Sequence, residues 1–335
     1  MRKNTIRIAA GLAAGALLAA TLFYVSFLRG RTTSASPVPE LLSLLPAGAP
    51  TLVYVDVAAM RASSFYQHRP DKSPVAIPNQ VYADFIRSTG FDFEKDLDRA
   101  VVGSWPPSDH EQIKTVVIAE GRFDRAKIHD YATRKGKIER QEGHDVFVFP
   151  QGDGKRFESI TFLDDHRLAM VSGPSIAPLF AGPNADRTAD PVRDRATRVD
   201  GAAAFLITHV PPIPNNAGAG QPPATAQFMA LARSVQWITV AARPEGDNLR
   251  LSVEGECDNS ADAAQLKSML DVLRMFGRAG LENPKTSQAM TPATLAALQN
   301  LLTTVEFTQA AERVRILLEL TPDVWRMSGP VKQQQ

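Results

Sequence analysis

The stretch QWITVAARPEGDNLRLSVEGEC, residues 236–257, contains the clearest indication of the fold in this sequence. Gln236–Ala242 and Asn248–Cys257 are rich in β-branched and apolar residues, and the turn-forming run Pro244-Glu245-Gly246-Asp247 lies between them. Two strands that are joined by a short turn pair in antiparallel orientation. The stretch therefore predicts an antiparallel hairpin in the C-terminal half of the chain.

Similar hairpins are predicted on both sides of this stretch, so we expect largely antiparallel sheets with helices packed on one face. The order strand–helix–strand–strand–helix–strand–strand occurs twice, and its best local echo is Glu120-Gly121 against Glu254-Gly255. Duplication explains this order, and so does chance, because most mixed chains contain such runs. We predict an α+β fold in which an N-terminal transmembrane helix precedes two similar antiparallel-sheet-plus-helix halves.

Element and domain boundaries follow from apolar periodicity and from turn residues. Strands are predicted at Thr51–Val57, Asp96–Val102, Lys114–Glu120, Lys137–Gln141, Val146–Pro150, Ser159–Leu163, Arg167–Ser172, Ala202–His209, Gln236–Ala242, Asn248–Cys257, Val305–Gln309 and Arg313–Leu320. Helices are predicted at Glu40–Leu45, Ala58–Ser63, Val81–Ser88, Asp124–Lys135, Ser175–Phe180, Thr225–Ser234, Ser260–Arg278 and Thr291–Leu302. The predicted domains are an anchor at 1–31, a linker at 32–39, a first half at 40–181, a linker at 182–200, a second half at 201–328 and a tail at 329–335.

The N-terminus contains a run that is long enough to cross a membrane. Ile8–Leu28 has no charged residue and would span roughly 31 Å as a helix, against about 30 Å for the hydrocarbon core of a bilayer. We predict a retained signal anchor, and a cleaved signal peptide with Ser34-Ala35-Ser36 before the cleavage site is the alternative. The predicted membrane-anchor residues are Ile8, Leu12, Leu17, Leu18, Leu22, Phe23, Val25, Phe27 and Leu28.

Basic flanks set the expected orientation of this anchor. Arg2, Lys3 and Arg7 precede the run, whereas Arg29 and Arg31 follow it, so the positive-inside rule favours a cytoplasmic N-terminus. We therefore predict a single-pass protein of the bacterial inner membrane with its C-terminal domain in the periplasm. Its expected partners are the lipid bilayer, through residues 8–28, and an envelope protein or peptide.

Composition narrows the classes of partner further. Residues 1–31 hold five of the 37 basic residues and none of the 36 acidic ones, so the remainder has a net charge of −4. Phosphate affinity comes from clustered Lys and Arg, so we expect no nucleic-acid binding. Cys257 is the only cysteine, which excludes an intrachain disulfide, and we expect it to be a buried core residue.

Motif searches identify few residues that could carry chemistry. Asp92, Glu94, Asp96 and Asp98 are spaced like calcium ligands, but Leu97 and Gly103 occupy the positions that need Gly and Glu. Ser172 lacks the pattern of a serine nucleophile and is better interpreted as a helix N-cap. Asp56 is expected to form an ion pair with Arg61. No cofactor or metal site is predicted.

One cluster of residues could carry chemistry. His144, Asp164, Asp165 and His166 would come close at one sheet edge if the strands Val146–Pro150 and Ser159–Leu163 pair. A metal or acid–base site could then form there, although Asp and His also serve as turn residues at strand ends.

Several segments resemble a loose group of membrane-anchored bacterial envelope proteins that have no assigned activity. The run Leu44-Leu45-Pro46-Ala47-Gly48-Ala49 with the following strand, Gly90-Phe91-Asp92 with residues 96–103, and residues 120–124 are similar to that group. The resemblance covers about residues 41–180. It implies an envelope location and a duplicated α+β fold, and it implies no catalytic residue.

Three functions remain open at this point. The favoured one is a non-catalytic binding or assembly module of the cell envelope, since no enzymatic motif was found. The second is an envelope hydrolase or metal-dependent enzyme that uses His144, Asp164, Asp165 and His166. The third is a carrier of a small ligand or lipid, which would need an apolar cavity of a few hundred Å³.

Overall fold

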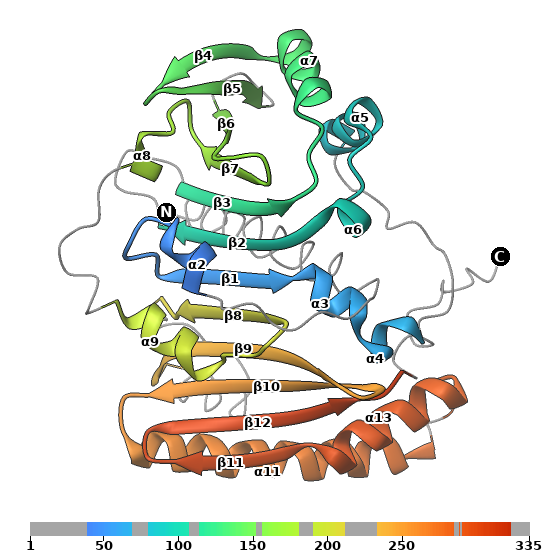
Figure 1. Cartoon of the computed structure of the whole chain (residues 1–335). Helices are drawn as coiled ribbons and strands as arrows, with labels where there is room; N and C mark the ends of the chain where they lie inside the picture. The colour runs from blue at the N-terminus through green and yellow to red at the C-terminus, as the bar shows by residue number, and fades with distance from the viewer. Residues whose placement is uncertain are drawn as a thin grey trace. The chain divides into compact units, whose positions relative to one another are not determined.

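The computed structural model describes residues 39–68, 80–106, 114–151, 156–180, 190–211, 233–284, 288 and 290–322 (Figure 1). The chain divides into two compact units: unit 1 is Met1–Gln67 with Asp71–Phe205, and unit 2 is His68–Pro70 with Leu206–Gln335. The predicted anchor Ile8–Leu28 lies outside the described residues. Among the helices that are described, none is long and apolar enough to cross a membrane.

Unit 1 is an antiparallel sheet with helices. Its strand order is β1-β2-β3-β7-β6-β5-β4, and each neighbouring pair is antiparallel. The strands are β1 Thr51–Asp56, β2 Leu97–Trp105, β3 Lys114–Gly121, β4 Lys137–Gln141, β5 His144–Gln151, β6 Arg156–Phe162 and β7 Arg167–Ser172. The helices are α2 Pro39–Ser43, α3 Val57–Ala62, α4 Ser64–Gln67, α5 Gln80–Thr89, α6 Phe93–Asp96, α7 Arg125–Lys135, α8 Ala177–Phe180 and α9 Pro191–Arg198.

Unit 2 repeats part of this order. Its strands follow the order β8-β9-β10-β12-β11, and β8, Ala204–His209, begins in unit 1. The others are β9 Val235–Glu245, β10 Asn248–Cys257, β11 Glu306–Ala310 and β12 Arg313–Leu320, with helices α11 Ser260–Glu282 and α13 Pro292–Thr304. In unit 1 the strand that precedes helix α7 is β3, which lies between β2 and β7. In unit 2 the strand that precedes helix α11 is β10, which lies between β9 and β12. The mixed α+β class and the antiparallel sheet are confirmed, and the internal duplication stays a prediction.

Helix α7 of unit 1 packs as a layer on β5 and β6. Asp124 caps α7 by accepting a hydrogen bond from the Lys127 backbone N–H at 3.1 Å, and the helix ends before Gly136, as predicted. The inner side of α7 packs into an aromatic core on the sheet. The buried members of this core are Ile128, Tyr131, Ala132, Phe147, Phe149, Phe162 and Leu168.

The β4–β5 hairpin has a tight turn that fixes its register. Glu142 has a φ of 49° and Gly143 a φ of 81°, as the two central residues of a type I′ turn require. Arg140 consequently faces Asp145 across the hairpin, and Gln141 faces His144.

Three local predictions need correction. Residues 190–200, expected in a linker, contain α9, because Asp190 caps the helix, Pro191 fits its first turn and Val192 and Ala196 are buried. Ser260, whose place at the start of the long helix predicts an N-cap, is instead the first residue of α11, and Asn259 caps the helix. Ser172 caps no described helix; it ends β7, and its Oγ accepts a hydrogen bond from the Thr115 N–H at 2.6 Å.

The spacing of Ala263, Leu266, Leu270, Leu273 and Phe276 predicts one apolar face on the long helix, and the structure packs only the first half of that face against the sheet. Ala263, Leu266 and Leu270 pack against the sheet as expected, but Leu273 and Phe276 are exposed. The helix turns 100° per residue, so positions 274, 277 and 281 continue the inward row instead. The predicted helix at 225–234 lies mostly outside the described residues.

Candidate functional site

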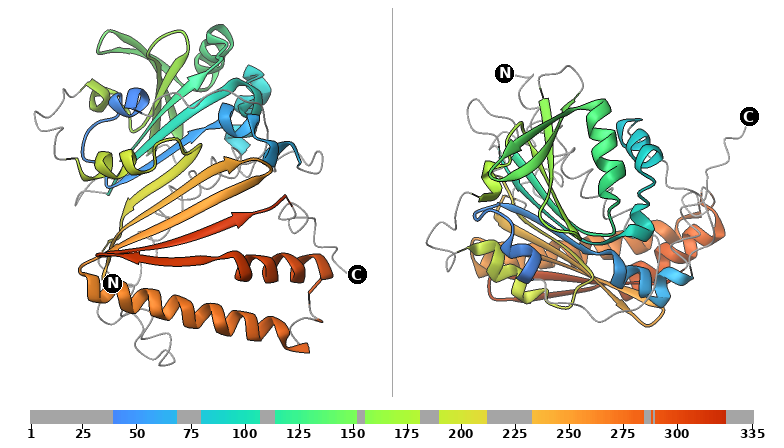
Figure 2. Two further views of the ribbon diagram at one scale, coloured as in Figure 1. Left: turned by 60° about the horizontal axis from the view of Figure 1, so that its bottom comes forward. Right: turned by 45° about the horizontal axis from the view of Figure 1, so that its top comes forward.

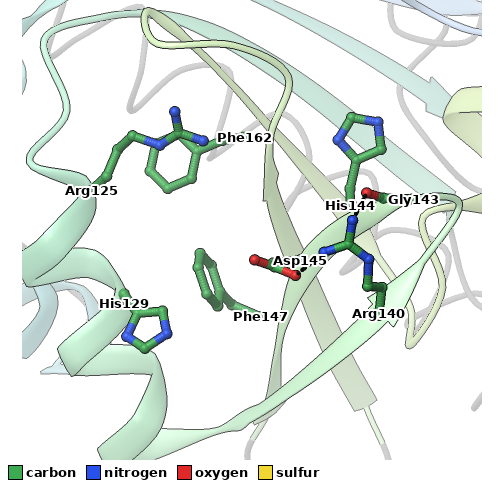
Figure 3. A pocket seen from close by; sticks show the side chains of 8 residues that line it. All are labelled: Arg125, His129, Arg140, Gly143, His144, Asp145, Phe147 and Phe162. Carbon is green, nitrogen blue, oxygen red and sulfur yellow. Dashed lines mark hydrogen bonds and ion pairs between the residues drawn. The ribbon is translucent and has the colours of Figure 1, made fainter.

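A hollow of about 330 Å³ lies on unit 1 between α7 and the β4–β5 hairpin (Figure 3). Figure 3 shows Arg125 and His129 on the α7 side, with Arg140, His144 and Asp145 on the hairpin side. It is lined by Arg125, His129, Arg140, Gly143, His144, Asp145, Phe147 and Phe162. The hollow therefore combines cationic and aromatic side chains from α7, β4, β5 and β6.

Two phenylalanines form the floor of the hollow. Phe147 on β5 and Phe162 on β6 are buried and meet edge to face, with 6.3 Å between ring centroids. The Arg125 guanidinium lies over the Phe162 ring, 4.7 Å from its centroid. Such a cation–π contact orients a guanidinium without consuming its N–H donors.

Each arginine of the hollow has one carboxylate partner. Arg125 pairs with Asp165 at 2.7 Å, and Arg140 pairs with Asp145 at 3.0 Å and donates to the Gly143 carbonyl at 2.8 Å. The side chains are well exposed, at 52% and 84% in the first pair and 72% and 63% in the second. Exposed ion pairs contribute only about 0–1 kcal/mol, so a ligand carboxylate can compete for these guanidiniums.

Two imidazoles complete the wall of the hollow. His129 lies one helical turn after Arg125 and approaches the Phe147 ring edge to face at 5.9 Å between centroids. His144 stacks on Phe180 of α8 at 5.0 Å. Both rings are thus oriented by aromatic contacts, and their ring nitrogens can exchange hydrogen bonds with a polar ligand.

The guanidiniums are the groups of this hollow that can bind an anion. Its lining carries two guanidiniums and one carboxylate, and Asp165 at its edge pairs with Arg125, so the two arginines and the two aspartates balance in charge. A guanidinium has five N–H donors and binds carboxylates with two of them. The arrangement suits a singly charged carboxylate that takes the place of Asp165 on Arg125 or of Asp145 on Arg140.

The four residues of the predicted cluster are only partly brought together. His144 lines the hollow described above, and Asp165 reaches its edge through the ion pair with Arg125. Asp165 and His166 line a second hollow of about 520 Å³ beside α5 and α7, with Phe91, Arg122 and Lys127 among its other lining residues.

Asp164 has a structural position in the β6–β7 turn. Its carboxylate accepts hydrogen bonds from the backbone N–H groups of His166 and Arg167, at 2.9 and 2.8 Å, and it also pairs with the Arg167 side chain. Burial raises the pKa of Asp164, but these hydrogen bonds outweigh burial and the pKa is lowered. Within the described parts of the chain, no group of three or more His, Cys, Asp or Glu side chains could hold a metal ion.

The other acidic residues from the sequence have structural positions. Asp92 caps α6 through the Glu94 N–H at 3.0 Å. Asp56 caps α3 through the Ala59 N–H at 2.6 Å, whereas Arg61 pairs with Asp98 at 2.7 Å rather than with Asp56. Cys257 is buried as predicted, and burial raises the pKa of its thiol.

A second polar feature crosses the sheet of unit 1. Asp56, Arg99, Glu120 and Arg167 are cross-strand neighbours on β1, β2, β3 and β7, so their side chains share one face with alternating charge. Arg99 forms an ion pair with Glu120. We call these four residues the charge row; alternating charge between neighbouring strands favours this register.

Sequence reasoning found His144 and missed Arg125, His129 and Arg140. The spacing of Arg125 and His129 places them on one helix face, and Arg140 and Asp145 flank a turn. These local signals exist, but such pairs are common on protein surfaces. Only the pairing of β5 with both β4 and β6 brings the two sets together.

Comparisons with known proteins give distant likenesses. No family model matches the sequence, and no curated protein matches it. Crystal form III of TP0453 is similar with a TM-score of 0.46 and 9% identity, over 87% of this chain and 96% of that one. Form I gives 0.41 and 8%, over 86% and 95%, and form IV gives 0.40 and 8%, over 89% and 98%. At this distance the likeness assigns no function to the chain.

Proposed function

We propose that this protein is a non-catalytic binding module of the bacterial cell envelope, and that the hollow of unit 1 holds an acidic side chain of an envelope protein or peptide. Ile8–Leu28 anchors the chain in the inner membrane, and the two units extend into the periplasm. The observation that carries the proposal is the convergence of Arg125 and Arg140 from two elements on one hollow with a phenylalanine floor.

A carboxylate suits this hollow better than a phosphate group. Asp145 lies in the lining and Asp165 beside it, so a doubly charged phosphate meets more repulsion than a single carboxylate. The two arginines already bind carboxylates, and an incoming one reproduces that geometry. The apolar floor accommodates the methylene groups that carry a glutamate carboxylate.

Calorimetric titration of the full chain in mild detergent tests this proposal. The probes are a capped glutamate-containing peptide, the same peptide with glutamine, and inorganic phosphate. We expect the glutamate peptide to bind and Arg125→Gln with Arg140→Gln to abolish its binding. Arg250→Gln is the matched control, because Arg250 also forms an exposed pair with a carboxylate, Glu245, at 3.2 Å in unit 2.

Three outcomes would contradict the proposal: equal binding of the glutamate and glutamine peptides, undiminished binding by the double variant, or tighter binding of phosphate. The location is tested separately. A reporter enzyme fused after Gln335 should be active only in the periplasm, and activity in the cytoplasm would overturn the orientation while leaving the hollow unaffected.

A further inference from the structure

The long helix of unit 2, α11, has an outer surface that is unusual for a helix on a protein surface. Val272, Leu273, Met275 and Phe276 are exposed at 43%, 48%, 60% and 65%. We call these four residues the apolar arc. Among the described residues the only other large hydrophobic side chains that are comparably exposed are Ile138 and Phe180, so the arc is a local concentration.

The inner face of α11 is already packed. Ala263 and Leu281 are buried, and Leu266 and Leu270 pack on the core around Cys257 and Val314. Gly277 lies so close to α13 that a Cβ there would be 3.2 Å from Leu302. Figure 2 shows α11 running along the strands of unit 2 beside β11. The apolar arc therefore lies on the side away from the core of its own unit.

Charge on the middle of α11 is confined to one stripe. Lys267, Asp271, Arg274 and Arg278 follow the spacing i, i+4, i+7, i+11, which places them on one side of the helix. Lys267 and Arg274 both pair with Asp271, at 2.6 and 3.2 Å. Arg274 turns toward its own unit, where it donates to the Val305 carbonyl at 3.0 Å and lies over the Phe307 ring. The stripe has a net charge of +2, and Lys267 and Arg278 are its cations nearer the arc, whereas surface helices normally turn charged residues outward.

The size of the arc argues against a second copy of the chain as the occupant. The exposed parts of four such side chains amount to roughly 400 Å². A stable protein interface takes about 800 Å² from each partner. A lipid surface needs no such area or shape match, because the arc only has to enter the boundary between headgroups and acyl chains.

We propose that the apolar arc lies on the surface of a lipid bilayer, with the charged stripe next to anionic headgroups. An apolar face bordered by Lys and Arg is the composition of helices that lie in the plane of a membrane interface. This inference rests on the proposed anchor, because a tether that keeps the chain at a bilayer makes a weak second contact effective. It is independent of the hollow in unit 1.

Fluorescence of a dye at position 275 tests the contact directly. The full chain carries Met275→Cys in a Cys257→Ala background, labelled with a polarity-sensitive dye, in vesicles of phosphatidylethanolamine and phosphatidylglycerol. Asp247→Cys, in the exposed β9–β10 turn, is the matched control site. We expect a blue-shifted emission and several-fold stronger quenching by spin-labelled lipid at position 275 than at position 247.

The Val272→Ser/Phe276→Ser variant should lose the blue shift at position 275 and retain its folded spectrum, since both side chains are exposed. Flotation of the vesicles tests membrane attachment by the anchor separately from the contact made by the arc. A chain that floats while the dye at position 275 stays in water overturns the arc contact and leaves the anchor intact. A chain that does not float overturns both. A blue shift that depends on protein concentration and is insensitive to lipid quenchers assigns the arc to a second copy and overturns the proposal.

Discussion

Replacing Arg99 by methionine removes the central positive charge of the charge row in unit 1. Asp56 is 6% exposed and faces Arg99 across β1 and β2, and Glu120 is paired with Arg99 on the other side. Removing one partner of a buried ion pair costs about 3–5 kcal/mol. Water reaches the 23% exposed Glu120 side chain, so we expect a cost of about 2–3 kcal/mol at pH 7.

This cost should fall with pH. Burial raises the pKa of Asp56, the Ala59 N–H and the Arg99 charge lower it part of the way back, and the pKa stays above its ordinary value. Without the Arg99 charge the pKa of Asp56 rises further. A carboxyl whose folded pKa lies above its unfolded value binds its proton more tightly when folded. Its stabilising contribution is complete below about pH 3.9 and is lost as pH rises through the folded pKa. The cost of Arg99→Met is therefore smaller at pH 4 than at pH 7.

Hydrogen exchange of the β2 and β3 amides measures this effect, because it reports on opening of unit 1 alone. Arg250→Met is the control: its ion pair with Glu245 is half exposed, and its loss should cost less than about 0.5 kcal/mol. An Arg99→Met cost as small as that of the control, or one that does not change between pH 4 and pH 7, would refute the account of the charge row.

Three further predictions concern single positions. Gly121→Ala should destabilise unit 1 by more than about 2 kcal/mol in hydrogen exchange, because the new Cβ would lie 2.2 Å from the Asp96 carbonyl oxygen. Gly280→Ala in α11 is the contrasting change: its Cβ meets nothing within 4 Å, so it should stabilise the helix by up to about 1 kcal/mol. Asp56→Asn should keep the N-cap of α3, whereas Asp56→Ala removes the cap and should lower the free energy of unfolding by about 1 kcal/mol, measured by thermal unfolding. Cys257 should react with a thiol reagent only after unfolding, because burial raises the pKa of its thiol; rapid labelling of the native chain would contradict this.

The hairpins of the fold could be predicted because their signals are local. The run from Val235 to Cys257 contains both strands and their turn, and the structure pairs Asn248 with Glu245 around it. Helix α9 was missed because Pro191–Arg198 is rich in charged residues. It has only two buried apolar side chains, Val192 and Ala196, and their burial depends on packing that the local sequence does not reveal.

The candidate site could not be predicted to the same extent, because its residues meet through the order of strands. Arg125 and Arg140 are neighbours of the same hollow only because β5 pairs with β4 on one side and β6 on the other. His144 was found because it lies just before a predicted strand, Val146–Pro150, whose pairing with the next strand could be expected from the sequence. The outer face of α11 was misjudged because the helix is apolar on several sides, so periodicity alone does not identify the side that meets the sheet.

The side-chain Nε–Hε resonances of Arg125 and Arg140 test the central claim most directly. The full chain in detergent is titrated with the glutamate-containing peptide while both resonances are followed by NMR. We predict that both shift together along one binding curve, while the Arg250 resonance stays in place. Resonances that do not move, or that move no more than that of Arg250, would contradict the assignment of the hollow as a binding site for an acidic side chain.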